Sequence, residues 1–228
     1  ILKAMLRAEV EGIGIPAKGV PQGGILSPLL SNIVLNELDW WISSQWQTFK
    51  TNKHQYSTND SKYKALHKTN LKEIYIVRYA DDFKITCKDK QTAKKIYIAT
   101  QMWLKERLGL EISPEKSKIT NIKKNYTEFL GYRIKAHKKK YVIKSKLTKK
   151  ASKNVQKKIK DQIKIVQHYP TAKEMYKLNR IIAGEHNYYA NASLVSQEFS
   201  KIYYNLSKCL KKRFKNLIPK RKKGKKKQ

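Results

Sequence analysis

Residues 78–83 read Arg78-Tyr79-Ala80-Asp81-Asp82-Phe83, and this stretch decides how the chain around it folds. The run before it, from Ile74 to Tyr79, is rich in β-branched and aromatic residues, which favour strands. After it the side chains alternate, and one side carries the apolar residues Phe83, Ile85 and Cys87. The pattern predicts a β-hairpin whose turn projects Asp81 and Asp82 together.

Two adjacent carboxylates at a turn are candidate ligands for a divalent cation. They repel each other, and a bound cation offsets that repulsion. Hard oxygen ligands suit Mg²⁺, which binds through one or two carboxylates plus the phosphates of a substrate. Asp81 and Asp82 are therefore the candidate catalytic and metal-binding residues of a two-metal phosphoryl-transfer site. Taken alone, the pair also fits an ordinary acidic turn, so its context has to decide.

Three further motifs accompany the hairpin in a fixed order. Gly19 to Asn32 reads Gly-Val-Pro-Gln-Gly-Gly-Ile-Leu-Ser-Pro-Leu-Leu-Ser-Asn and precedes it. Gly109 to Lys118 reads Gly-Leu-Glu-Ile-Ser-Pro-Glu-Lys-Ser-Lys and follows it, and Phe129-Leu130-Gly131-Tyr132 comes next. Together these motifs resemble the reverse transcriptases encoded by group II introns. The resemblance implies an RNA-directed DNA polymerase that uses Mg²⁺, dNTPs, an RNA template and a DNA primer or target. It also implies a maturase that binds intron RNA and assists splicing.

The resemblance assigns roles to individual residues. Asp81 would ligate both metals, Asp82 would support the site, and Tyr79 would pack beneath the primer end. The glycine-rich loop would line the nucleotide pocket with Pro21, Gln22 and Gly23, since glycines permit close approach. Lys116 would act as a general acid near the leaving pyrophosphate, although a lysine is more commonly a solvated surface charge. The primer-binding residues would be Phe129, Leu130, Gly131 and Tyr132, for which the alternative is a buried strand with a glycine bulge.

A two-metal polymerase needs a further carboxylate from an upstream strand. Glu9 and Glu11 are the acids before the glycine-rich loop, and neither lies in a matching motif. Asp39, after the loop, is interpreted as a residue on a helix face. The chain also opens in the middle of a periodic segment. We therefore expect a fragment that is inactive alone, taken from a protein that is an enzyme.

The charge of the chain indicates a polyanionic partner. Its 228 residues include 51 Lys and Arg against 17 Asp and Glu, a formal net charge of +34. Residues 135–228 hold 29 of the basic residues and 4 of the acidic ones. This excess points to a polyanion, for which the alternative is a generally basic protein, and the motifs above favour nucleic acid over a membrane surface. No apolar run is long enough to cross a bilayer, so we expect no membrane partner and a cytoplasmic protein of bacterial type, associated with RNA or the nucleoid.

The periodicity predicts an α+β fold in two units. Residues 1–144 show a mixed α and β pattern, with helices from Ser27 onward and over 91–108, the second of which Gly109 ends. The resemblance implies that these residues form a partial polymerase palm of antiparallel strands with helices. A polar, aperiodic stretch at about 43–72 is expected to be a surface insertion, and strands are expected at 117–122, 128–136 and 140–144. Residues 145–217 show three amphipathic helices, of which Pro170 ends the first and a capping box of Thr171 and Glu174 begins the second, and a disordered basic tail is expected at 218–228. The resemblance implies that this helical unit is a thumb or maturase domain.

The helical unit carries the candidate RNA-binding residues. Its cations would follow phosphates, and Lys149, Lys150, Lys157, Lys158 and Arg180 are the candidates. The segment Ile182 to Ala190 resembles a maturase motif, which adds Asn187, Tyr188 and Tyr189. The alternative for such charge runs is a solvated helix face.

Two other functions stay open. The first is an RNA-binding splicing factor without polymerase activity, against which the intact Tyr-Ala-Asp-Asp and Pro-Gln-Gly motifs argue. The second is another bacterial reverse transcriptase of the retron, diversity-generating or defence-associated type, against which the maturase-like segment argues.

Overall fold

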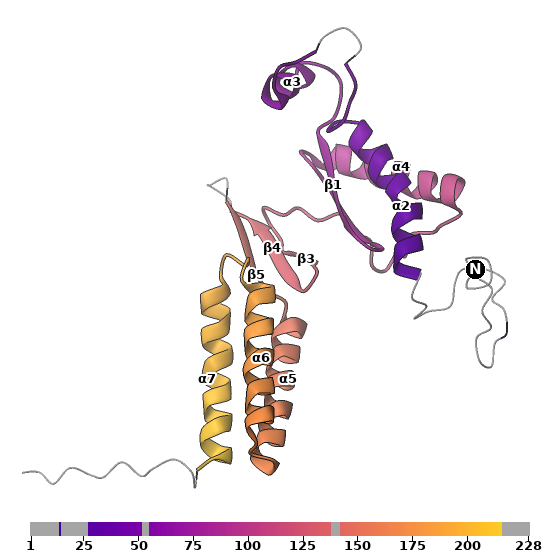
Figure 1. The fold of residues 1–228 in the computed structure, drawn as a ribbon. Coiled ribbons are helices and arrows are strands. Elements are labelled where there is room, and N and C mark those ends of the chain that lie inside the picture. Colours follow the sequence, from indigo (N-terminus) through magenta and orange to yellow (C-terminus); the bar gives the residue numbers. More distant parts are fainter. Residues whose placement is uncertain (1–13, 15–26, 52–54, 138–141, 216–228) are drawn as a thin grey trace, which may run out of the picture. The chain divides into compact units, whose positions relative to one another are not determined.

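The structure, a computed structural model, describes residues 14, 27–51, 55–137 and 142–215 (Figure 1). The fold is α+β, as predicted, and the chain divides into one unit within Ile1–Ile119 and another within Thr120–Gln228. This division comes before the boundary predicted after residue 144, so the later strands join the helical unit. In the described part of the chain, no helix combines the length and apolar composition needed to cross a membrane.

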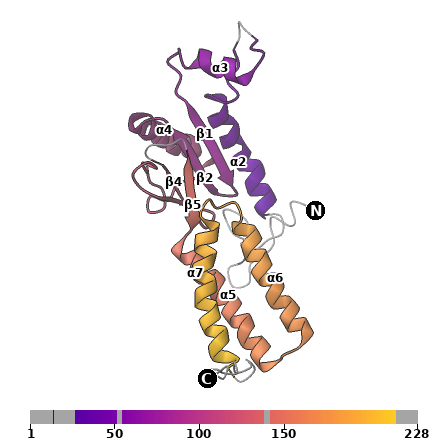
Figure 2. The ribbon, with the colours of Figure 1, turned by 90° about the vertical axis from the view of Figure 1, so that its left-hand side faces the viewer.

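The first unit is built around the predicted hairpin. Strands β1 (Ile74–Tyr79) and β2 (Asp82–Cys87) pair antiparallel, with Ile74 opposite Cys87 and Tyr79 opposite Asp82. Helices α2 (Ser27–Ser44) and α4 (Lys90–Leu108) pack against the hairpin (Figures 1 and 2). The predictions of the hairpin and of both helices are confirmed.

Local signals in the sequence fix the ends of α4. Asp89 caps its first turn by accepting a 2.8 Å hydrogen bond from the backbone N–H of Thr92. Hydrogen bonds from Thr92 hold the pKa of the Asp89 carboxyl below its usual value, because they favour the ionised form. At the other end, Gly109 adopts a left-handed conformation with φ of 62°, which a residue without Cβ reaches at little cost.

The polar stretch at 43–72 differs from the prediction. It contains the helix α3 (Asn59–Leu66), which Thr58 caps through its hydroxyl. Trp46 and Leu66 are buried in the same core as Leu38 and Ile42 of α2. The stretch is therefore not uniformly aperiodic, because two large apolar residues anchor it to the hairpin and α2. Polar composition hid these anchors, which are spaced too far apart to give a periodic signal.

The second unit begins with a three-stranded antiparallel sheet, in the order β3 (Thr127–Phe129), β4 (Tyr132–Ala136) and β5 (Ile143–Leu147). Two strand predictions are corrected here. Residues 117–122 form no strand, and the single strand expected over 128–136 is two strands joined by a turn at Leu130 and Gly131. Both turn residues have positive φ, of 49° and 81°, and such values suit a two-residue hairpin loop.

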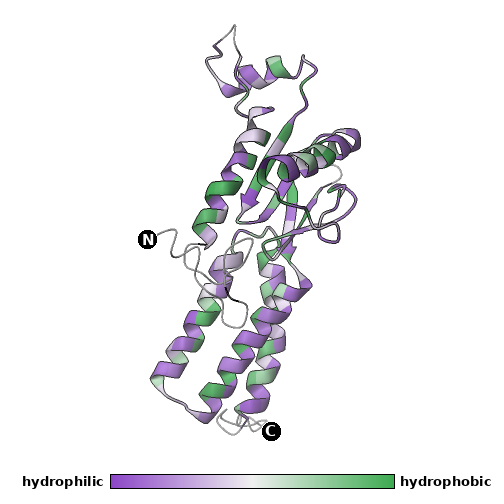
Figure 3. Cartoon of the chain, turned by 90° about the vertical axis from the view of Figure 1, so that its right-hand side faces the viewer, coloured by the Kyte–Doolittle hydropathy of each residue, from purple (hydrophilic) through white to green (hydrophobic). Residues whose placement is uncertain are grey.

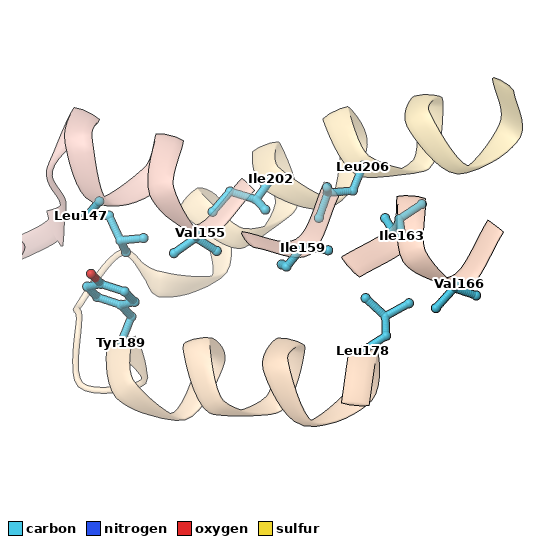
Figure 4. Packing of buried hydrophobic residues seen from close by; sticks show 10 residues of the cluster. Leu147, Val155, Ile159, Ile163, Val166, Leu178, Tyr189, Ile202 and Leu206 are labelled. Atoms are coloured by element: carbon cyan, nitrogen blue, oxygen red, sulfur yellow. The ribbon is translucent and has the colours of Figure 1, made fainter. Parts of the chain in front are cut away.

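Three helices follow, as predicted: α5 (Lys149–His168), α6 (Ala172–Tyr189) and α7 (Val195–Arg213). Hydrophobic and hydrophilic residues alternate along them with helical spacing (Figure 3). The buried stripe of α5 packs between the other two helices, and Figure 4 shows it as Val155, Ile159, Ile163 and Val166. The small sheet lies at the end of the bundle where β5 leads into α5 (Figures 1 and 2).

The predicted capping box at the start of α6 forms only by half. Thr171 accepts a 3.3 Å hydrogen bond from the backbone N–H of Glu174, as the box requires. The Glu174 carboxylate instead accepts a 2.6 Å hydrogen bond from the buried amide of Gln162. The same amide also donates to the Glu174 backbone carbonyl at 3.3 Å. A buried polar group of α5 therefore takes the Glu174 carboxylate away from the cap position, and its hydrogen bond to the charged acceptor is a strong one.

Candidate active site

The turn between β1 and β2 is the candidate active site. Because Tyr79 pairs with Asp82, the loop contains just Ala80 and Asp81. Ala80 has φ of 53°, a left-handed value that costs a non-glycine residue about 1–2 kcal/mol. Such a conformation persists when surrounding contacts fix it.

Arg78 supplies those contacts. Its side chain is 10% exposed, and its Nε and Nη2 atoms form a bidentate ion pair with Asp39 of α2 at 2.7–3.0 Å. Its Nη1 donates to the backbone carbonyl of Ala80 at 2.8 Å and to the side-chain oxygen of Asn32 at 2.9 Å. One planar guanidinium therefore ties the strained turn to two points on α2, a geometry that lysine cannot reproduce.

The two carboxylates themselves are exposed. Neither the Asp81 nor the Asp82 carboxylate forms a hydrogen bond or ion pair with another described residue. Their oxygens are thus open to a cation, and two hard donors fit Mg²⁺, whose remaining sites water and phosphate can fill. Within the described ranges, no third His, Cys, Asp or Glu joins them to make a metal-binding group of three.

The other predicted residues of the first unit lie as follows. Tyr79 is 64% exposed, so its ring is open to a partner beside the turn. Lys116 is exposed in a turn, and among the hydrogen bonds and ion pairs of the described residues none joins it to Asp81. Pro21, Gln22 and Gly23 lie outside the described residues. The assignments of Tyr79, Lys116 and the nucleotide loop stay predictions.

The predicted primer-binding residues form the turn between β3 and β4, and this turn contacts the end of α6. The Tyr132 hydroxyl donates to the backbone carbonyl of Tyr188, and the Tyr188 hydroxyl donates to that of Leu130 at 3.3 Å. Tyr132 also packs on the ring of Tyr189, with 5.3 Å between the ring centroids. Burial raises the pKa of the Tyr132 and Tyr189 hydroxyls, which stay protonated donors at neutral pH. Two segments with separate predicted roles are therefore one physical cluster.

This cluster corrects one RNA-binding assignment. Tyr189 is 7% exposed and belongs to the core of the helical unit, where Figure 4 shows it near Leu147. Its role is packing, because a ring buried in this way cannot stack on a base. Asn187 and Tyr188 are exposed, and so are the five predicted cations Lys149, Lys150, Lys157, Lys158 and Arg180. Lys158 already pairs with Glu185 at 2.6 Å.

Gly131 gives this cluster a sharp test. A Cβ at this position would lie 2.9 Å from the Tyr189 hydroxyl oxygen, and φ is 81°. We expect Gly131→Ala to destabilise the second unit by about 2 kcal/mol, from backbone strain plus displacement of the tyrosine. Denaturant unfolding followed by the helical circular dichroism signal measures this change in unfolding free energy.

Gly184 of α6 is the matched control, because a Cβ there would meet nothing within 4 Å. Gly184→Ala should stabilise the same unit by about 0.5–1 kcal/mol, since alanine favours the helix. Equal effects of the two substitutions would contradict the described packing of the turn against Tyr189.

The brace formed by Arg78, Asp39 and Asn32 was not predicted from the sequence. Asp39 was interpreted as a helix-face residue and Arg78 merely as part of the motif. One signal could have found the pair. The chain has 44 Lys and 7 Arg, so an arginine beside the acid pair indicates a need for a planar, bidentate donor.

The described part of the chain thus combines an exposed acid pair on a braced hairpin with a basic helical unit. The family described as Reverse transcriptase (RNA-dependent DNA polymerase) matches residues 2–134. The chain belongs to this family.

Similar proteins support the assignment to the reverse transcriptase family. Protein YkfC of Escherichia coli is 33% identical over 126 residues, covering 52% of this chain and 32% of that protein. The Group II intron-encoded protein LtrA of Lactococcus lactis is 30% identical over 176 residues, covering 60% of this chain and 29% of that protein. The Uncharacterized 91 kDa protein in cob intron of Schizosaccharomyces pombe is 29% identical over 147 residues, covering 51% of this chain and 18% of that protein.

The chain thus spans about a third or less of the length of these relatives. The intron-encoded relatives confirm the resemblance to group II intron reverse transcriptases and maturases. Members of the family generally use a divalent metal, which agrees with the two exposed carboxylates.

Proposed function

We propose that the protein carrying this chain is an RNA-directed DNA polymerase of group II intron type. It would extend a DNA primer on an RNA template from dNTPs. The observation that carries the proposal is the exposed Asp81–Asp82 pair, at a turn that Arg78 fixes, in a chain of the reverse transcriptase family. In this reading the first unit is part of the palm and the second includes the thumb.

Different residues of the chain would have different roles in the reaction. Asp81 and Asp82 would hold Mg²⁺ together with phosphate oxygens of the incoming nucleotide. The bound metal would supply the Lewis acidity that activates the primer 3′-hydroxyl and stabilises the leaving pyrophosphate. Tyr79, exposed beside the turn, would support the primer terminus, and Lys116 would protonate the pyrophosphate. Arg78 would keep the carboxylates in place without touching the substrate.

We infer a second role in binding intron RNA and assisting splicing. Exposed lysines on α5, together with Tyr188 and Asn187 near the end of α6, support it. The net charge of +34 makes such binding strongly dependent on salt. This role needs no catalysis by the acid pair, so the two functions can be separated experimentally.

Metal-dependent primer extension tests the proposal. A longer polypeptide that also supplies the upstream carboxylate strand should extend a DNA primer on RNA with Mg²⁺ and stop when EDTA removes the metal. The 228-residue chain alone should give no extension, because a two-metal site needs a further carboxylate.

Two results would contradict this account in different ways. Extension by the 228-residue chain alone would show that the upstream carboxylate is dispensable. A longer polypeptide that binds RNA tightly yet never extends a primer would favour the splicing factor.

A further inference from the structure

One face of the small sheet in the second unit carries an unusual concentration of positive charge. Side chains alternate between the two faces of a strand. Leu147 and Tyr132 point to the core of the helical unit, where Leu147 is buried and Tyr132 packs against it. The alternate residues of β4 and β5 therefore lie on the opposite face, away from that core. They are Arg133, Lys135, Lys144 and Lys146. We call these four residues the basic sheet face.

The strand register sets like charges directly opposite each other. Arg133 pairs with Lys146, and Lys135 pairs with Lys144. Each like-charged pair costs roughly 0.2–1 kcal/mol relative to a neutral pair. Glu128, opposite Arg133 on β3, supplies one carboxylate at 3.6 Å from the Arg133 Nε. The face therefore keeps an excess of three positive charges.

Tyr126 holds three of these cations together. Arg133, Lys146 and Lys135 lie 4.8, 4.9 and 5.4 Å from the centroid of its half-buried ring. The ring offers its π-face to cations and so lowers the cost of bringing them close. The buried Nε of Arg133 has no hydrogen-bond partner, and its carboxylate neighbour stands beyond hydrogen-bonding distance. The cations are therefore held close together, while most of their positive charge is not neutralised.

Protection of a sheet edge does not explain this charge. Lysines on an edge strand discourage pairing with other chains, and β5 is such an edge. Arg133 and Lys135, however, lie on β4, the central strand, where both neighbours already occupy the hydrogen-bonding positions. The positive charges on the central strand therefore cannot protect an edge, and they act on whatever contacts the face of the sheet.

We propose that the basic sheet face binds the phosphate backbone of a double-stranded nucleic acid, an RNA template paired with its complementary strand. This rests on the proposed polymerase function, which supplies such a duplex. Phosphodiesters complement a flat face with two rows of cations. A single strand would need aromatic rings for its bases, and Tyr126, the ring at this face, is half-buried among the cations. A-form duplexes are recognised mainly by shape and backbone, which such a face can supply.

The test compares two variants of the 228-residue chain that each lose four positive charges. The first replaces Arg133, Lys135, Lys144 and Lys146 with Gln. The second replaces Lys173, Lys177, Lys211 and Lys212 with Gln, four exposed lysines at the start of α6 and the end of α7. These positions lie at the end of the bundle away from the sheet (Figures 1 and 2).

Fluorescence anisotropy then measures the affinity for an RNA–DNA duplex and for a single-stranded RNA of equal charge at several salt concentrations. The sheet variant should bind the duplex on the order of 30- to 100-fold more weakly near 0.15 M salt, and the slope of log affinity against log salt should fall by about 3. The control should lose less than about fivefold. The two variants should differ far less in their affinity for the single-stranded RNA.

The unfolding midpoint of the sheet variant should not fall, because removing like-charge repulsion compensates for the lost contacts to Tyr126. Protection from an amine-reactive reagent gives an independent reading on the unmodified chain. The duplex should protect Lys135, Lys144 and Lys146 more than the four control lysines.

The outcomes separate this inference from the proposed function. Equal losses in the two variants, equal protection, or a loss confined to the single strand would overturn the sheet-face site while leaving the polymerase proposal standing. Failure of the unmodified chain to bind either nucleic acid would overturn the sheet-face site and the proposed binding of RNA by the helical unit. The site would also be overturned if the basic sheet face bound an acidic protein while the chain had no affinity for nucleic acid.

Discussion

Asp81→Asn, introduced into a polypeptide that carries the complete catalytic unit, is expected to lower Mg²⁺-dependent DNA synthesis by on the order of 10³-fold or more. The substitution keeps the shape of the side chain but removes its charge. Asp81 lies in the two-residue loop itself, open to a cation. A lost metal ligand costs several kcal/mol of transition-state stabilisation, and about 4 kcal/mol corresponds to that factor. Steady-state primer extension measures it.

Two companion variants give this result its meaning. Asp82→Asn should lower synthesis less, because Asp82 is the first residue of β2 and would support the site from beside it. Asp60→Asn should leave synthesis unchanged, since Asp60 is an exposed carboxylate that pairs with Lys64 on α3. RNA binding should persist in all three variants. If Asp81→Asn retained synthesis, the acid pair would be an ordinary acidic turn.

Arg78→Ala is expected to destabilise the first unit by about 3 kcal/mol. The substitution leaves Asp39, whose side chain is 32% exposed, without its partner, and it removes the hydrogen bond that holds the strained Ala80. Breaking a buried ion pair costs about 3–5 kcal/mol, and the partial exposure of Asp39 puts the effect near the lower end. The catalytic turn should loosen at the same time.

The tryptophans make this effect measurable in one unit alone. All four, Trp40, Trp41, Trp46 and Trp103, lie in the first unit, so their fluorescence reports its unfolding. Arg107→Ala is the matched control, because Arg107 forms a comparable but exposed ion pair with Glu37 on the same helix α2. The control should cost less than about 1 kcal/mol. Equal losses in the two variants would show that burial of Arg78 contributes nothing.

Arg78→Lys separates positioning from folding. Lysine keeps the charge beside Asp39 but cannot reach Ala80 and Asn32 together as the planar fork does. A positioning role predicts a lower kcat for primer extension with little change in KM, in a variant that still folds. A purely structural role predicts unchanged kcat once the variant is folded.

Local patterns predicted much of the fold. The alternation around Asp81 and Asp82 identified the hairpin, Gly109 marked the end of α4, and Pro170 separated α5 from α6. These features depend on neighbours within a few residues, so the sequence contains them directly. The acid pair was found for the same reason, since both carboxylates stand in one short motif.

The features that were missed depend on partners far apart in the chain. Arg78 and Asp39 are 39 residues apart, and nothing local says which acid the guanidinium will choose. The turn at Leu130 and Gly131 was interpreted as part of one strand, because leucine rarely takes positive φ and gave no turn signal. The buried Tyr189 resembled its exposed neighbour Tyr188, and the packing of the turn on α6 alone distinguishes them.

The most direct test of the acid pair uses paramagnetic Mn²⁺ as a probe for divalent-metal binding by the 228-residue chain. Backbone amide resonances of Ala80 and its neighbours at the β1–β2 turn should broaden first as Mn²⁺ is added. Excess Mg²⁺ should restore them, and Asp81→Asn should abolish the effect. Broadening centred elsewhere in the chain, or broadening at the turn that survives in Asp81→Asn, would contradict the claim that these two carboxylates form the metal site.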